Sequence, residues 1–408
     1  MSWLACTLDD ICDKVDGHIQ TGPFGSQLHQ SDYSKVGTPV VMPKDIVNGT
    51  ISEEGIARVS EEHVLRLSRH KVRTGDILFS RRGDVGRCAY ISPKEQGWLC
   101  GTGCLRVTVD AKVADSKFIF YYLQQASAID WIEKHAIGAT MLNLNTGILA
   151  TVPIMLPSLP TQRRIASILS AYDDLIENNR RQIKLLEEAA QRLYREWFVE
   201  LRFPGHESVK VVDGVPEGWT VTTASEVTNV LRRGISPNYD ETARLSVISQ
   251  KCIRQYMVDM NQVRRQSKSF DSSMGLLDSD TVICSTGTGT LGRVGKVFGN
   301  HPNCTFDSHV TLVRTNGIVG KHYLNLRMYE LREYFDSCKT GSTNQTELSR
   351  SIVQNVKVYI ADSHTQQIFE KIEEAYHQKM MICQHQIQLL TETRDRLLPK
   401  LMNGEMEV

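Results

Sequence analysis

The chain contains a long internal repeat. Residues 161–198 align without gaps with residues 365–402 at a constant offset of 204 positions, half of the 408-residue length. Identical residues at this offset include Thr161 and Thr365, Tyr172 and Tyr376, Gln182 and Gln386, and Leu193 and Leu397. A repeat of this kind predicts two equivalent halves, each with one globular segment followed by one long helix.

Both repeated segments carry a seam of mainly apolar residues spaced alternately by three and four, which is typical of a helix that packs against another helix. The seam of the first segment is Leu169, Tyr172, Ile176, Asn179, Ile183, Leu186, Leu193 and Trp197. That of the second is Tyr376, Met380, Ile387, Leu390, Leu397 and Leu401. We expect an antiparallel coiled coil of about 57 Å, at roughly 1.5 Å per residue, in which Asn179 either fixes the register or is solvated.

The ends of the helices have local signals. Ser158 and Asp362, also 204 positions apart, are expected N-caps, whereas Pro204-Gly205 and Pro399 are expected stops. A long core helix within one domain would explain a single seam. Two equivalent seams, each placed after a globular stretch of similar length, favour a spacer.

These features predict an α+β protein with an internal pseudo-two-fold repeat. Its length exceeds that of one typical domain, roughly 100 to 200 residues. We expect two mixed α/β globules joined by the two long helices. The predicted segments are globule 1 (1–157), central helix (158–203), globule 2 (204–361) and C-terminal helix (362–408).

The globules also resemble each other. The segment 76–87 parallels 280–293, since each combines a short apolar strand, a Gly-rich polar loop and a second strand that begins near an arginine. Gly138-Ala-Thr140 likewise parallels Gly341-Ser-Thr343. Further strands are expected at 105–109 and 310–313, and helices at 117–123 and 321–329.

Charge is balanced over the whole chain but segregated locally. Lys+Arg and Asp+Glu both number 47, which excludes a uniformly basic coat. Residues 58–106, however, hold ten Lys/Arg against five Asp/Glu, and residues 231–268 hold eight against three. Each globule therefore has a local positive excess suited to a polyanion such as DNA.

Side chains able to read base edges or bind phosphates gather at the Gly-rich loops and the other shared segments. For each of them, a solvated turn or a surface ion pair is the competing interpretation. The candidate DNA-binding residues are Lys44, Ser80, Arg81, Arg82, Arg87, Thr140, Asn143, Lys251, Ser285, Thr286, Thr288, Arg293, Thr343 and Asn344.

Other sites are not favoured by the sequence. Gly287-Thr-Gly289-Thr-Leu-Gly292 matches a dinucleotide fingerprint, but residues 293–300 alternate like a strand where the fingerprint needs a helix. Cys100 and Cys104 lack a second ligand pair for zinc, and the ten cysteines are expected to be reduced and mostly buried. No catalytic motif was found. Without a signal peptide or a long apolar run, the expected location is cytoplasmic.

The helical segments resemble the spacer regions of the specificity subunits of type I restriction-modification enzymes. The similarity is strongest in Leu156–Ile165, in Trp197-Phe198 and in the ending Arg394–Glu405 with its Leu-Leu-Pro-Lys-Leu. Gly22-Pro-Phe-Gly25, the loop near Asp76 and Gly341-Ser-Thr343 are similar to pieces of that family's target recognition domains.

The resemblance implies a non-catalytic subunit that binds double-stranded DNA, with each recognition domain reading half of a split target. It also implies that the helices set the gap and dock two modification subunits. Restriction subunits are a further partner where the host has them. No cofactor is expected on this chain; S-adenosylmethionine, ATP and magnesium are expected in the partners. One alternative is a DNA methyltransferase or nuclease fused to a coiled coil, which needs a methyl-donor motif or an acidic metal cluster. The other is a structural coiled-coil scaffold, which leaves the basic globules unexplained.

Overall fold

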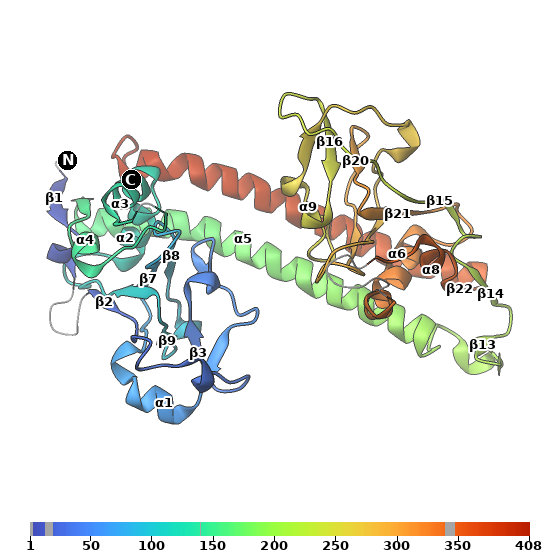
Figure 1. Ribbon diagram of the computed structural model, residues 1–408, viewed down its shortest axis with the longest axis horizontal. Helices are drawn as coiled ribbons and strands as arrows, with labels where there is room; N and C mark the ends of the chain where they lie inside the picture. Colours follow the sequence, from blue (N-terminus) through green and yellow to red (C-terminus); the bar gives the residue numbers. More distant parts are fainter. Residues whose placement is uncertain (1–2, 13–18, 139, 339–346) are drawn as a thin grey trace. The chain divides into compact units, whose positions relative to one another are not determined.

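The computed structural model describes residues 3–12, 19–138, 140–338 and 347–408 (Figure 1). The chain forms two compact units. Unit 1 comprises residues 1–176 and 389–408, and unit 2 comprises residues 177–388. These units are defined by contacts, so they cut across the predicted segments, which follow the ends of the helices.

Unit 1 contains a four-stranded sheet, a three-stranded sheet and two ribbons of two strands each. The four-stranded sheet has the order β2 (Ile19–Thr21), β10 (Cys104–Val107), β7 (Ile77–Ser80) and β8 (Cys88–Tyr90). The three-stranded sheet has the order β6 (Ala57–Val59), β3 (Thr38–Val41) and β9 (Leu99–Cys100). The ribbons pair β1 (Leu4–Thr7) with β11 (Pro153–Leu156), and β4 (Ile46–Val47) with β5 (Thr50–Ile51). The short helices are α1 (Glu61–Arg66), α2 (Ser116–Leu123), α3 (Ala126–His135) and α4 (Thr146–Ala150).

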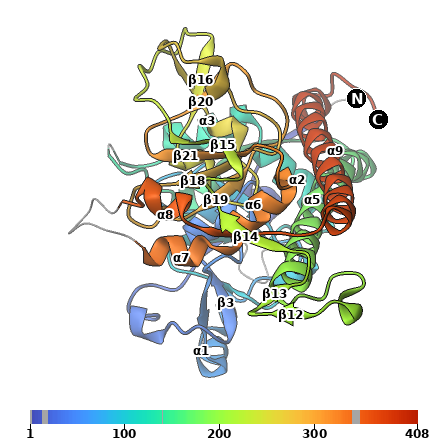
Figure 2. The same cartoon turned by 90° about the vertical axis from the view of Figure 1, so that its right-hand side faces the viewer.

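Unit 2 repeats this plan. Its four-stranded sheet has the order β15 (Thr228–Arg233), β21 (Val310–Thr315), β18 (Thr281–Cys284) and β19 (Val294–Lys296). Its three-stranded sheet has the order β17 (Arg264–Gln266), β16 (Leu245–Ile248) and β20 (Cys304–Phe306). The ribbons pair β14 (Thr220–Thr223) with β22 (Lys357–Ile360), and β12 (Val211–Val212) with β13 (Val215–Pro216). The short helices are α6 (Lys321–Glu330), which packs on β18, β19 and β21, α7 (Arg332–Ser337) and α8 (Arg350–Gln354) (Figure 2).

Strand directions and register confirm that the globules are related and that both mix α and β structure. In each three-stranded sheet the central strand has one antiparallel and one parallel neighbour. In the four-stranded sheets Ile77 lies opposite Tyr90, and Thr281, its equivalent at the 204-residue offset, lies opposite Lys296. The apolar runs of β7 and β18 are buried on both faces, so they form the centres of the two sheets.

The two long helices are α5 (Leu159–Tyr194) and α9 (Ser363–Met402). Each contributes one part to each unit. None of the predicted seam residues is exposed, and Asn179 is buried rather than solvated. Four apolar residues that lie off the seam, by contrast, are about half exposed: Leu175, Leu185, Ile382 and Leu389. Others, such as Ile165 and Phe369, are buried in the globular parts of the two units. The heptad pattern therefore identified the inward faces of both helices.

The predicted N-caps are confirmed. Asp362 accepts hydrogen bonds from the backbone amides of His364 and Thr365, both at 3.0 Å. Ser158 makes a longer contact of 3.5 Å with the Thr161 amide. The equivalent residues Gln162 and Gln366 donate to the carbonyls of Pro157 and Ala361, at 2.9 and 2.8 Å.

The predicted stops were wrong in position. α5 ends at Tyr194 and is followed by a π-helical turn, Arg195–Val199, before Pro204 is reached. Pro399 lies inside α9, which continues to Met402. Leu401 and Met402 are buried in the core of unit 1, and their burial favours this last turn over the local effect of a single proline. Among the described residues, no helix has the length and apolar character needed to cross a membrane.

Candidate nucleic-acid interface

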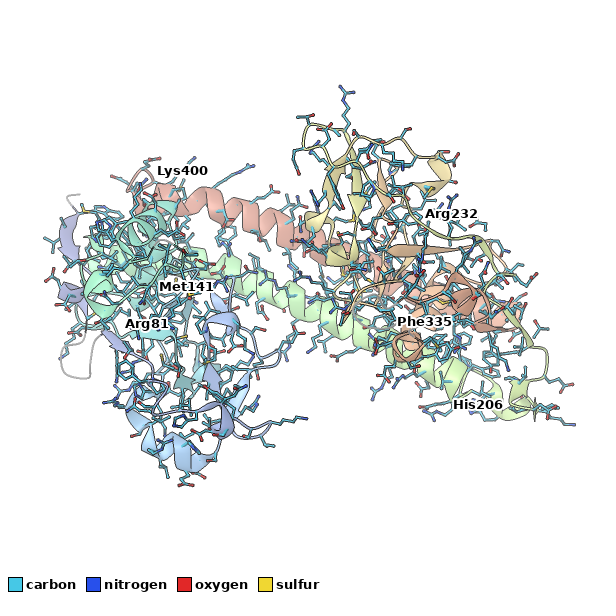
Figure 3. All side chains as sticks on the ribbon, viewed as in Figure 1. Arg81, Met141, His206, Arg232, Phe335 and Lys400 are labelled. Atoms are coloured by element: carbon cyan, nitrogen blue, oxygen red, sulfur yellow. The ribbon has the colours of Figure 1, made fainter. Side chains whose placement is uncertain are left out.

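In unit 1 the Gly-rich loop after β7 lies between two other loops. The Arg81 amide donates to the Gly103 carbonyl at 2.8 Å. On the other side, the Leu144 amide donates to the Arg81 carbonyl at 2.8 Å, and the Gly83 amide donates to the Leu142 carbonyl at 3.0 Å. Segments separated in sequence thus present their side chains together, and Figure 3 shows Arg81 and Met141 in the same part of this unit.

Most unit 1 candidates lie at this junction. Asn143 forms a backbone bridge with Arg82, and Thr140 is exposed on the same loop. Lys44 is exposed on a turn whose Pro43 packs against Gly103, where an added Cβ would lie 3.3 Å from the proline ring. These loops expose polar and basic side chains together with the apolar Ile137 and Met141, each 63% exposed.

The arginines of this loop differ in their exposure and in whether another side chain already binds them. Arg82 is exposed, and Arg81 is half-buried with its Nε buried and without a hydrogen-bond partner among the described residues. Arg87 is held by Asp84, whose carboxylate accepts from Nη2 at 2.7 Å and from Nε at 3.0 Å. Arg81 and Arg82 are therefore better placed than Arg87 to meet an anionic ligand.

Unit 2 places its Gly-rich loop in the same way. The Leu348 amide donates to the Ser285 carbonyl, and the Ser285 amide donates to the His309 carbonyl, both at 2.8 Å. Gln250 donates through Nε2 to the Thr286 hydroxyl at 2.8 Å, which attaches the turn that carries the exposed Lys251.

The remaining unit 2 candidates vary in exposure. Thr286 contacts His309 Nδ1 at 2.7 Å, and Thr288 is exposed. Arg293 is half-buried and donates to the Gly289 carbonyl at 2.8 Å. Thr343 and Asn344 lie outside the described residues.

Two serine candidates are not placed to touch a ligand. Ser80 is 2% exposed, and its hydroxyl donates to the Arg82 carbonyl at 3.0 Å. Ser285 is 0% exposed, and its hydroxyl lies 2.6 Å from that of Thr311. Both residues shape the loop from inside. Ser80 is the last residue of β7 and Ser285 follows β18, and because both strands are buried on both faces, a side chain on either face lies in the core.

The glycines of the unit 2 loop serve its conformation and close packing. Gly292 has φ +81°, and a Cβ there would lie 2.8 Å from the Asp336 amide nitrogen. The loop leads into strand β19 and not into a helix, as predicted, so it lacks the helix N-terminus of a dinucleotide site.

In unit 1, burial raises the pKa of the Cys100 thiol to about 12, and Cys104 is buried beside it.

Some unit 2 residues that shape the Gly-rich loop or suit a nucleic-acid ligand were missed by the sequence reasoning. Gln250 and His309 organise the unit 2 loop, but they give no local sequence signal. Tyr239 is 45% exposed, and the Arg264 guanidinium lies 3.5 Å from its ring centre. Arginine next to an exposed aromatic ring suits a nucleic-acid surface, and the basic content of residues 231–268 was the signal available for it.

Comparisons with known proteins agree with this geometry. Residues 2–188 match the profile of the type I restriction modification DNA specificity domain. The type I restriction enzyme MjaIX specificity subunit of Methanocaldococcus jannaschii is 25% identical over 382 residues, covering 91% of this chain and 87% of that protein. The HindI specificity subunit of Haemophilus influenzae is 21% identical over 414 residues, covering 83% and 88%.

A solved structure shows the same fold. The crystal structure of the type I restriction-modification system S subunit from M. genitalium superposes with a TM-score of 0.60 at 18% identity. The superposition covers 98% of this chain and 96% of that one. The similarity thus extends over both units and both long helices.

Proposed function

The chain belongs to the specificity subunits of type I restriction-modification enzymes, and from this premise we propose that each unit carries one DNA recognition domain that reads half of a two-part target. The observation that carries the proposal is the duplicated sheet topology. In both units the loop after the central buried strand is tied to the same neighbouring loops. Two equivalent surfaces fit a DNA target that is contacted twice.

The chemistry of these surfaces supports DNA as the ligand. Exposed Arg82 and Lys251 can neutralise phosphates, and Arg81, Asn143, Thr288 and Arg293 offer the donors and acceptors that distinguish base edges. This division explains how the chain can combine general affinity for DNA with preference for a sequence.

We further propose that α5 and α9 form an antiparallel coiled coil that spaces the two recognition domains. Within unit 1, Asp173 of α5 accepts from Nη1 of Arg394 of α9 at 2.6 Å. Within unit 2, Gln182 of α5 contacts Cys383 of α9 at 3.8 Å. The early part of α5 therefore meets the late part of α9, and the late part of α5 meets an earlier part of α9, as antiparallel pairing requires.

In this proposal the exposed faces of the helices dock two modification subunits. Those subunits, and restriction subunits where present, supply methylation and cleavage together with S-adenosylmethionine, ATP and magnesium. The half-exposed Leu175, Leu185, Ile382 and Leu389 offer apolar contact area on these faces. DNA in the cytoplasm is the substrate of the assembly.

The test is to reconstitute the chain with modification subunits and to map methylated bases in genomic DNA. We expect a two-part target with one fixed gap. Inserting one heptad after Ile183 and one after Ile387 should lengthen each helix by about 10.5 Å, close to three base pairs at roughly 3.4 Å each. Methylation with an unchanged gap by the folded insertion variant would contradict the spacer role.

A further inference from the structure

Unit 2 contains a cluster of buried charged and polar side chains between its globular part and α9. We name it the docking cluster. Its globular members are Asp278, Lys296, Lys321 and His322, and its α9 members are Glu370, Glu373, Glu374 and His377. Lys296, His322 and His377 are 0% exposed, and Glu373 is 1% exposed. Charged side chains are almost never buried to this extent unless they are paired. Neither carboxylate oxygen of Glu373 has a hydrogen-bond partner among the described residues, and its attracting cation is Lys296.

Hydrogen bonds join the sheet to α9 through the start of α6. The Lys296 ammonium donates to His322 Nδ1 at 2.7 Å. With Nδ1 accepting, the proton of the neutral His322 ring lies on Nε2, which donates to Glu374 at 2.9 Å. Each group in this chain therefore has one defined donor or acceptor role.

A second branch closes the network. Lys321 lies 3.1 Å from the Glu374 carboxylate and 3.3 Å from that of Asp278. Asp278 in turn accepts from His377 Nε2 at 2.8 Å. The α9 side chains Glu374 and His377, one turn apart, are thus both held by the same globular groups.

Glu370 joins α9 to backbone amides in the first turn of α6 through hydrogen bonds. Its carboxylate accepts from the backbone amides of His322 and Tyr323 at 3.3 and 2.8 Å. It thereby caps α6, whose own N-cap, Gly320, has no side chain to do so. A Cβ at Gly320 would lie 2.0 Å from the Glu370 carboxyl group, so a side chain at this position would displace the carboxylate that caps α6.

The fold itself does not require this cluster. At the 204-residue offset Glu370 corresponds to Ala166 and Glu373 to Leu169, and both of these unit 1 residues are part of its apolar core. Sheet register makes Lys296 equivalent to Tyr90. His322 is equivalent to Lys117, because each is the second residue of its helix and donates its amide to the capping carboxylate. In unit 1 the Lys117 ammonium lies over the Tyr90 ring, 5.3 Å from its centre. A buried polar network seldom stabilises more than apolar packing would, but its directional bonds are satisfied in one arrangement only.

We propose that the docking cluster positions the second recognition domain at one place along α9, and that it thereby helps to fix the gap between the two half-sites. The inference rests on the proposed function. Sliding α9 by one helical turn, about 5.4 Å, would separate Glu370 from the start of α6 and leave Lys296 and Glu373 in the wrong surroundings. An apolar joint would tolerate small shifts, because apolar contacts are not directional.

The experiment compares gap discrimination in reconstituted complexes. Lys296→Met, His322→Phe and Glu373→Leu together replace buried charged and polar groups of the docking cluster by apolar side chains. DNA duplexes carry the mapped target with its native gap or with one base pair more or fewer. We expect the triple variant to keep both half-site sequences, while its preference for the native gap falls about fivefold or more.

A milder pair of variants guards against misfolding. Glu370→Ala removes the cap of α6 and should relax gap discrimination, whereas Glu370→Gln retains a carbonyl oxygen that can accept from the Tyr323 amide and should preserve it. Leu169→Met, in the apolar joint of unit 1, is the matched control and should leave the preference unchanged.

Different results would contradict the role of the docking cluster and the proposed DNA-recognition function. If the cluster only stabilises the fold, binding weakens equally for all gaps, and an unchanged preference in both the triple variant and Glu370→Ala would overturn the inference. A wild-type complex that methylates without a two-part target would overturn the proposed function itself, and the inference with it.

Discussion

Units 1 and 2 share one strand order, but positions at which a long helix meets the globular part are apolar in unit 1 and charged in unit 2. In unit 1, Ala166 and Leu169 of α5 are buried in an apolar core. In unit 2 the equivalent positions of α9 are Glu370, which caps α6, and the buried Glu373, which lies in the docking cluster. The same backbone arrangement therefore accommodates an apolar joint and an ionic one.

The comparison separates two sets of residues. One set forms the sheets, and the other forms the joint, by which we mean the contact between the globular part of a unit and its long helix. The sheets of both units depend on apolar strands such as β7 and β18, which are buried on both faces. The joints contribute less to topology, so their chemistry can diverge after duplication. Apolar contacts give stability without direction, whereas the docking cluster gives direction at a cost in desolvation.

The largest effect is expected from introducing a unit 2 charge into unit 1. Leu169→Glu places a carboxylate in an apolar core, whereas Glu373 is attracted by the Lys296 ammonium. The substitution should reduce the free energy of unfolding by about 4 kcal/mol. Leu169→Met, which nearly conserves volume, should cost less than about 1.5 kcal/mol. Denaturant unfolding monitored by fluorescence measures both. Similar stabilities for the two variants would show that the unit 1 joint already tolerates charge.

The pH dependence of the ionic joint gives the next test. Burial raises the pKa of the Glu373 carboxyl from 4.5 to about 7 and lowers that of the Lys296 ammonium from 10.5 to about 8. Mutual attraction between the two groups opposes both shifts. The Glu373 contribution to stability therefore falls as pH rises from 4.5 to 7, and the Lys296 contribution recovers as pH rises from 8 to 10.5.

Lys296→Met with Glu373→Leu removes both titrations. The difference in free energy of unfolding between the variant and the wild type should favour the variant most between pH 7 and 8. At pH 5 this difference should be smaller by roughly 3 kcal/mol at most. Asp278, Lys321, His322 and Glu370 face the pair and are unchanged in this comparison. Unfolding curves from pH 5 to 9 measure the difference, and a difference independent of pH would contradict the assigned titrations.

The DNA surfaces should show that the units act separately. Arg81→Ala in unit 1 and Arg293→Ala in unit 2 should each weaken binding by roughly 1 to 3 kcal/mol if the arginine reads a guanine edge, with relaxed preference in one half-site only. A phosphate contact would instead weaken binding to all sequences and reduce the salt slope by about one. Arg87→Ala is the comparison, because Asp84 already pairs with Arg87. If affinity and salt slope stay unchanged in all three variants, these loops are not the DNA surface.

The smallest expected effect concerns the helix caps. Asp362→Ala removes two 3.0 Å hydrogen bonds from backbone amides and one of 2.6 Å from the Thr365 hydroxyl, and should cost about 1 to 2 kcal/mol. Ser158→Ala removes one backbone hydrogen bond of 3.5 Å and the 2.9 Å contact with the Thr161 hydroxyl, and should cost about 0.5 kcal/mol. Partial burial alone would raise the pKa of Asp362, but hydrogen bonds from Thr365 and His364 outweigh it and lower the pKa. The Asp362 contribution is therefore lost as pH falls. Thermal unfolding, with Ser167→Ala as an exposed control within α5, measures this order; equal costs for both caps would contradict it.

The sequence alone determined the features that depend on contiguous residues. The repeat, the two long helices, their caps and their inward faces all follow from periodicity and spacing within one segment, because a helix with a heptad seam has little choice about which face it buries. The strand after Gly292 was likewise predictable from alternation. The candidates Arg81, Arg82 and Thr288 were found in the same way, since Gly-rich loops between strands place polar residues at a surface.

Only the tertiary structure decided how distant segments meet. It buried the Ser80 and Ser285 hydroxyls, set residues 142–144 beside Arg81, and carried α9 past Pro399 because Leu401 and Met402 enter a core. It also paired Asp278 with His377, 99 positions away in the sequence. Buried charges have no periodicity that reveals their partners, because the desolvation that makes such pairs necessary arises only after the segments have packed together.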